Sequence, residues 1–160
     1  MSITTPLLKD DNYILWTKEG LITWDDFQGE PDPKFAKELK NYGAKVTATI
    51  DHRIQWAFDN EDEHPKLECR GVKVWCFFNK ELSWVKQQFF LESQPYIDEV
   101  LSHEQGHFDL AEEYTRFIET KLKEMLLNEQ FRIPGQTKEE KLANIDSEIA
   151  KLDKRFYQSL

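Results

Sequence analysis

The feature that most constrains the fold is a strict alternation of apolar and polar residues from Ala44 to Phe58. One set of alternate positions carries Val46, Ala48, Ile50, His52, Ile54, Trp56 and Phe58. A period of two over this length is typical of a β-strand with one buried face. A second candidate strand runs from Leu67 to Phe78, and the polar linker Asp59–Pro65 between the two suits a hairpin.

The period becomes helical after Pro95. It predicts one long helix from Ile97 to about Leu127, and the pair Pro134-Gly135 marks the end of this helical region. A second helix follows Thr137, because Glu140 three residues later completes a capping box. One apolar stripe runs along this second helix and must pack against another element. The stripe consists of Leu142, Ile145, Ile149, Leu152 and Phe156.

Strands in the first half and helices in the second predict an α+β fold rather than an alternating α/β fold. A length of 160 residues suits a single domain, with a β-rich part at about 13–80 and a helical part at about 96–160. Within the first part, Leu21–Gly29 is predicted to be a short extended segment that enters a turn. We expect a brief helix from Pro33 to Lys40.

The amino-acid composition argues against some classes of binding partner. With 30 acidic residues against 21 basic ones, the formal net charge of -9 argues against binding to nucleic acid or to an anionic membrane surface. No stretch approaches the roughly 20 apolar residues of a membrane-spanning helix. The start of the chain lacks the features of a signal peptide, so we expect a cytoplasmic protein, or an exported one if the sequence is a mature fragment. Cys69 and Cys76 would lie about 23 Å apart along one strand, so we expect two reduced thiols.

The predicted long helix contains the motif His103-Glu104-Gln105-Gly106-His107. Two histidines at positions i and i+4 lie one helical turn apart, so both rings can reach one metal ion. The glutamate beside the first histidine can then act as general base on a metal-activated water molecule. The motif therefore predicts a zinc site with His103 and His107 as ligands and Glu104 as the catalytic residue.

The helical phase predicts that these three side chains project from the apolar side of the helix. That side also carries Val100, Ala111, Tyr114, Ile118, Leu122 and Met125. The side that we expect to face water carries Asp98, Gln105, Asp109, Glu112 and Arg116. A buried Glu104 costs several kcal/mol unless a charge compensates it. A divalent cation is one explanation, and a hydrogen-bonded cluster in which Glu104 pairs with a histidinium is the other.

A catalytic zinc site usually has a third protein ligand. In an unbroken helix Glu113 points away from the metal, and Asp109 lies on the solvent side, so we reject both. The third donor must come from another segment, which leaves four candidates without a choice between them. They are Asp146, Glu148 and Asp153 in the last helix and His52 in the first strand.

Four segments occur in the order Leu21–Gly29, Val72–Phe78, Ser83–Val85 and Leu101–Glu112. Together they resemble the bacterial DUF922 family, whose members are labelled zinc-dependent or secreted proteases. The resemblance covers roughly residues 20–120, and its most specific part is the run HEQGHFD from His103, followed by Arg116.

The resemblance implies a zincin-like fold in which His103 and His107 bind zinc and Glu104 is the base. Family members often carry a downstream YDxxTxHG segment as a source of another ligand, whereas this sequence has no histidine after His107. Three explanations stay open: a carboxylate third ligand, a shortened chain, or lost activity. Many relatives are exported.

These observations predict a zinc metalloprotease, a hydrolase whose partner is a peptide or protein substrate. An extended substrate can add to the edge of the sheet, for which the strand Ala44–Phe58 is a candidate. The alternative is a catalytically impaired binding or assembly module, favoured by the missing third histidine and by the aromatic residues Trp84, Phe89 and Phe90 if they are exposed. A metal-dependent hydrolase of another substrate class is a third possibility.

Overall fold

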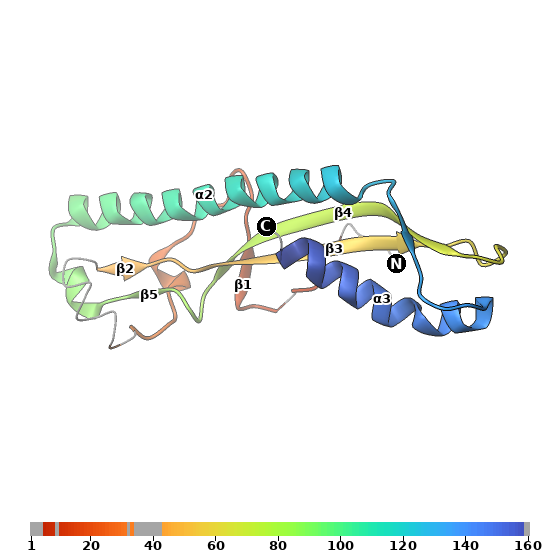
Figure 1. The fold of residues 1–160 in the computed structure, drawn as a ribbon. Helices are drawn as coiled ribbons and strands as arrows, with labels where there is room; N and C mark the ends of the chain where they lie inside the picture. Colours follow the sequence, from red (N-terminus) through yellow and green to blue (C-terminus); the bar gives the residue numbers. More distant parts are fainter. Residues whose placement is uncertain (1–4, 9, 32, 34–42, 159–160) are drawn as a thin grey trace. The chain divides into compact units, whose positions relative to one another are not determined.

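The structure is a computed structural model, and it describes residues 5–8, 10–31, 33 and 43–158. These residues form two α-helices, α2 (Gln94–Leu126) and α3 (Lys138–Gln158). The longer strands are β3 (Ala48–Ala57) and β4 (Lys66–Asn79), and Figure 1 shows them beside each other. The short strands are β1 (Tyr13–Leu15), β2 (Ala44–Lys45), β5 (Trp84–Val85) and β6 (Gln130–Arg132). Trp24–Asp26 and Gln87–Leu91 are 3-10 helices.

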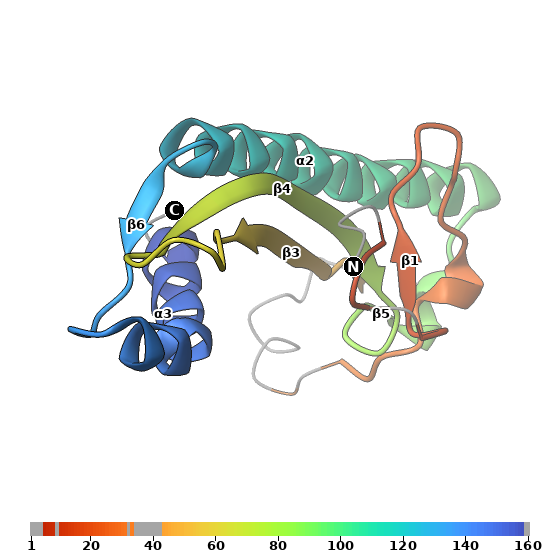
Figure 2. The same ribbon diagram turned by 90° about the vertical axis from the view of Figure 1, so that its right-hand side faces the viewer.

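The strands form two antiparallel sheets. The larger has the order β1-β4-β3, and β6 also pairs with β4, where Leu67 lies opposite Phe131 (Figure 2). The smaller sheet pairs β2 with β5. The predicted α+β class is therefore confirmed, and so are the two long helices and the strand β4. Among the described helices, none combines the length and apolar character that crossing a membrane requires.

The predicted strand Ala44–Phe58 is interrupted. Its first two residues pair with β5, and the strand resumes at Ala48 beside β4. The change of partner occurs at Thr47, whose N–H donates to Ser83 Oγ at 2.9 Å and whose carbonyl accepts from the Asn79 N–H at 2.9 Å. A second correction concerns Leu21–Gly29, which contains a 3-10 turn rather than only extended chain. The expected helix Pro33–Lys40 lies outside the described residues, apart from Pro33 itself.

The chain divides into two compact units. The unit that contains residues 75–115 also takes in the N-terminal segment from residue 7 and the strand β2. Its core joins Phe78 of β4 to Phe108 of α2, whose rings meet edge to face at 5.7 Å. Aromatic residues that follow β4 in the chain belong to the same unit. Trp84 and Phe89 are buried, at 3% and 6% exposed, whereas Phe90 is exposed. Two of the three aromatics considered for a binding surface are thus core residues.

The other unit contains residues 52–74 and the chain from residue 116 onward. Here the predicted stripe of α3 packs as expected: Ile145 and Leu152 are buried against Leu67 of β4 and Ile133. Thr137 caps α3, since its Oγ1 accepts from the Glu140 N–H at 3.2 Å, and the Glu140 carboxylate accepts from the N–H of Gln136 at 2.8 Å. A side-chain contact also joins α3 to β3, where His52 Nε2 lies 3.0 Å from Asp153 Oδ2.

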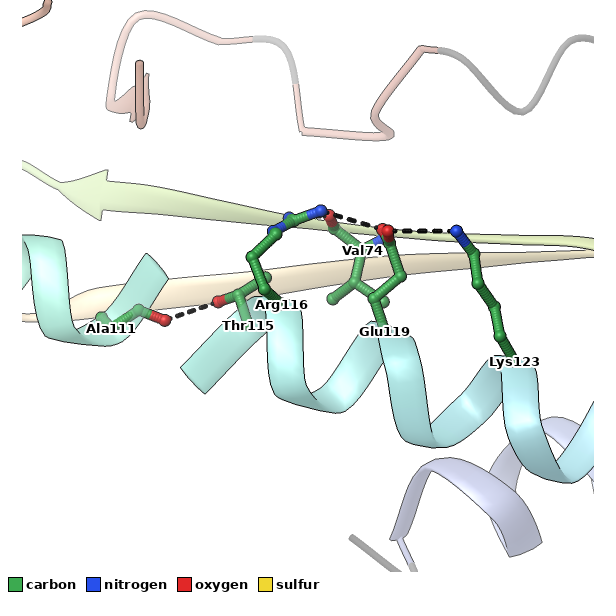
Figure 3. A network of polar contacts seen from close by, with 6 residues as sticks. All are labelled: Val74, Ala111, Thr115, Arg116, Glu119 and Lys123. Atoms are coloured by element: carbon green, nitrogen blue, oxygen red, sulfur yellow. Dashed lines mark hydrogen bonds and ion pairs between the residues drawn. The ribbon is translucent and has the colours of Figure 1, made fainter. Parts of the chain in front are cut away.

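A polar network also stabilises this second unit (Figure 3). Glu119 of α2 is 9% exposed, and its Oε2 accepts a hydrogen bond from the Val74 N–H at 2.8 Å. Arg116 donates to the carbonyl of Val74 and also to Glu119. The two side chains thus satisfy the N–H and the C=O of one residue on β4, as a neighbouring strand would, and this protects the sheet edge at that point.

Two glycines permit a stability test with opposite expected signs. A Cβ at residue 29 would lie 2.9 Å from the carbonyl oxygen of Ser83 and closer still to that of Glu81, whereas one at residue 106 would have no neighbour within 4 Å. We expect Gly29→Ala to lower the free energy of unfolding by about 1–3 kcal/mol. Gly106→Ala, inside α2, should raise it by up to about 1 kcal/mol, because alanine loses less backbone entropy in a helix. Urea denaturation measures both, and equal effects would contradict the packing at Gly29.

Candidate metal centre

The centre of the candidate site is a pair of imidazoles one turn apart on α2. His103 Nε2 and His107 Nε2 lie 3.0 Å from each other, and the two rings meet edge to face with their centroids 4.5 Å apart. Both side chains are exposed. The helical spacing places the rings on one side of α2, as the sequence predicts, and the two ring nitrogens point toward the same small volume.

Glu104 completes the group. Its side chain is 4% exposed, and its carboxylate lies within 4.8 Å of the histidine nitrogens. Burial raises the pKa of Glu104 above its usual value, against the opposing effects of His107, His103 and a hydrogen bond from the Val46 backbone. In the protein without a metal, the folded state therefore disfavours the carboxylate form, and a nearby cation would reverse this preference.

The chemistry of the donor set fits a divalent metal ion. Imidazole nitrogens bind zinc at about 2.0–2.1 Å, so two nitrogens 3.0 Å apart can both reach one ion. The group of His103, Glu104 and His107 is also the one group of three or more potential metal ligands among the residues that the structure describes. The alternative to a metal ion at this pair is an imidazole–imidazole hydrogen bond, in which one ring donates and the other accepts.

The third ligand is not found in this group. All four candidates from the sequence belong to the other compact unit, and none joins the group within the described parts of the chain. His52 and Asp153 instead bind each other, and the His52 ring stacks on Tyr157 with the centroids 3.7 Å apart. Asp146 is exposed and Glu148 is half-buried on α3.

The buried side of α2 differs from the predicted one by a roll of about 60° around the helix axis. Glu104 is buried as expected, but the two histidines are exposed, and so is Tyr114 at 51%. The expectation that all three motif residues face the apolar side was wrong for the histidines. The residues buried along the helix are Ile97, Glu104, Phe108, Thr115, Ile118, Glu119, Leu122 and Leu126.

Two polar residues that the sequence analysis placed on the solvent side explain this rotation of the helix. Gln105 Oε1 accepts a hydrogen bond from the Ile22 N–H at 2.8 Å, and Asp109 Oδ1 accepts one from Trp16 Nε1 at 2.9 Å. Gln105 also donates to Asp109 at 2.9 Å. The two side chains therefore hold the N-terminal segment against the helix, on the side away from the histidines, and this fixes the orientation of the motif.

The cavity beside the motif also has walls that the sequence did not reveal. It measures about 410 Å³, and its other lining residues come from β2, the start of β3 and the next turn of α2. These residues are Ala44, Lys45, Val46, Ala48 and Ala111. Nothing in the spacing of the motif points to them, because they reach it only through the packing of the strand segment on the helix.

Comparisons with protein-family models, curated proteins and solved structures found no match to this chain.

Proposed function

We propose that the chain is a zinc-dependent hydrolase that cleaves peptide bonds, as the resemblance to the DUF922 family implies, with a zincin-like arrangement of its motif helix. The observation that carries the proposal is the group on α2, where two histidine nitrogens 3.0 Å apart lie beside a buried glutamate. His103 and His107 would hold the zinc ion, which as a Lewis acid activates water and polarises the scissile carbonyl.

Glu104 acts as the general base and then as the general acid. It takes the proton of the attacking water and passes it to the leaving amine. A cation held by the two histidines would favour the carboxylate form of Glu104, which is the form that a general base needs. The hydrogen bond from the Val46 backbone holds the carboxylate in place beside the histidines.

The strand beside the motif offers a place for an extended substrate. β3 ends the strand order β1-β4-β3, so its outer edge has no neighbour within the sheet as the structure describes it. Ala48, at the start of β3, lines the same cavity as His103 and Glu104. A peptide that adds to this edge gains main-chain hydrogen bonds independent of its sequence.

Zinc content tests the metal site directly. We expect the purified wild-type protein, stripped with a chelator and reloaded, to hold stoichiometric zinc by elemental analysis. His103→Ala should lose it, because one imidazole does not make a site. His64→Ala is the matched control, since His64 is exposed in the acidic linker and should leave the zinc content unchanged. A wild-type protein that holds no zinc contradicts the proposal.

The alternative function is a non-catalytic binding module built on the same helix. Leu110 and Tyr114, which lie one turn apart beyond His107, are 61% and 51% exposed, and a binding module could present these two large side chains to a partner beside the motif. Stoichiometric zinc without cleavage of a broad peptide library would favour this alternative over the hydrolase.

A further inference from the structure

The cavity next to the histidines has an apolar wall. Ala44 is buried, and Val46, Ala48 and Ala111 pack against the core that contains Phe78 and Phe108. Because these side chains belong to a packed core, the wall is preformed and does not have to be ordered when a ligand enters.

The polar groups of the cavity come from the other residues that line it. Glu104 and the two histidines belong to the candidate metal centre, and Lys45 is exposed. The volume of about 410 Å³ lies within the range of small-molecule pockets. The small size of the residues on the apolar wall leaves this space open. Ala111 in particular follows His107 by one helical turn, so its side chain lies near the histidine and Glu104.

From this we propose that the cavity is a specificity pocket that accepts an apolar side chain of the substrate next to the reacting bond. The inference rests on the proposed hydrolase function and adds its substrate class: peptides with a branched aliphatic or aromatic residue at the position that enters the pocket. Glycine or alanine would leave the apolar wall exposed to water.

The test uses ligands that differ only in this side chain. Leucine hydroxamate and glycine hydroxamate carry the same zinc-binding group, so the ratio of their affinities for the zinc-loaded protein reports the pocket alone. We expect leucine hydroxamate to bind at least about tenfold more tightly to the wild-type protein. The preference should also appear in a peptide library as cleavage beside Leu and Phe rather than beside Gly.

Filling the pocket should remove the preference. Ala111→Leu adds volume on the helix wall with little change in helix propensity. Ala48→Leu adds volume on the strand wall, and it replaces the first variant in the test if that variant folds poorly. Ala143→Leu, at an exposed position of α3, is the matched control. We expect the affinity ratio to fall close to unity in the two pocket variants, with zinc content unchanged, and to stay at the wild-type value in the control.

The outcomes separate this inference from the proposed function. A wild-type protein that holds zinc and cleaves peptides but shows no apolar preference overturns the pocket and leaves the hydrolase standing. A preference that survives in both pocket variants overturns the pocket as well. A wild-type protein without zinc overturns the proposed function, and the pocket inference falls with it.

Discussion

Replacement of Glu104 by Gln should abolish hydrolysis while the protein still holds its zinc. Glutamine keeps the shape of the side chain but neither takes nor returns a proton, so kcat/KM should fall by about 10³-fold. Zinc content should stay at the wild-type value, because the ligands are His103 and His107. Activity is measured on a peptide that the wild-type protein cleaves. Glu113→Gln, at an exposed carboxylate of the same helix, is the control and should retain full activity.

The same variant should be more stable than the wild type when the metal is removed. The pKa of Glu104 is raised in the folded protein, so stability falls as the pH rises from the unfolded pKa, about 4.3, through the folded value. Above that window the buried carboxylate costs stability, and glutamine removes this cost. Thermal unfolding at neutral pH in the presence of a chelator should show the gain, and zinc should reduce it. A variant that loses zinc, or one with wild-type activity, contradicts the role of Glu104.

The long helices and strands could be predicted from the sequence, because each contains enough residues for its hydrophobic period to stand out. β3, β4, α2 and α3 all appear in the structure as the predicted types of element, and the stripe of α3 is buried as expected, whereas the buried side of α2 is rotated and burial does not alternate along β3. β5 and β6, with two and three residues, are too short to show a period. They form because β2 and β4 lie beside them, which is a tertiary effect.

The candidate site was predictable only as far as its motif. The spacing of His103, Glu104 and His107 brings the three together in any α-helix. The roll of the helix was not predictable, since hydropathy treats Gln105 and Glu119 as solvent-facing residues. Both are instead bound by backbone groups of other segments, Ile22 and Val74. The cavity walls come from segments far away in sequence, and any third ligand would too, and one sequence alone carries no signal for such packing.

Glu119 is a buried acid whose loss should destabilise the fold strongly, because its carboxylate binds a backbone group of β4. Glu119→Ala leaves the Val74 N–H without its partner and removes the ion pair with Arg116 at 3.0 Å and that with Lys123 at 3.3 Å. We expect the free energy of unfolding to fall by about 3 kcal/mol, because an unsatisfied buried donor adds to the lost charge-assisted hydrogen bonds. Glu124→Ala is the control, since its ion pair with Lys121 is exposed and contributes about 0.5 kcal/mol or less.

The pH dependence gives the network a second, independent signature. Burial alone would raise the pKa of Glu119, but the hydrogen bond from Val74 and the charges of Arg116, Lys123 and Lys73 outweigh it and lower the pKa. The stabilisation by this carboxylate is therefore present above the unfolded pKa, about 4.3, and is lost as the pH falls through the lower folded value. Urea denaturation at a series of pH values should show a smaller acid-induced loss of stability in Glu119→Gln than in the wild type. Parallel curves for the two proteins would mean that the carboxylate is not bound to β4 in solution.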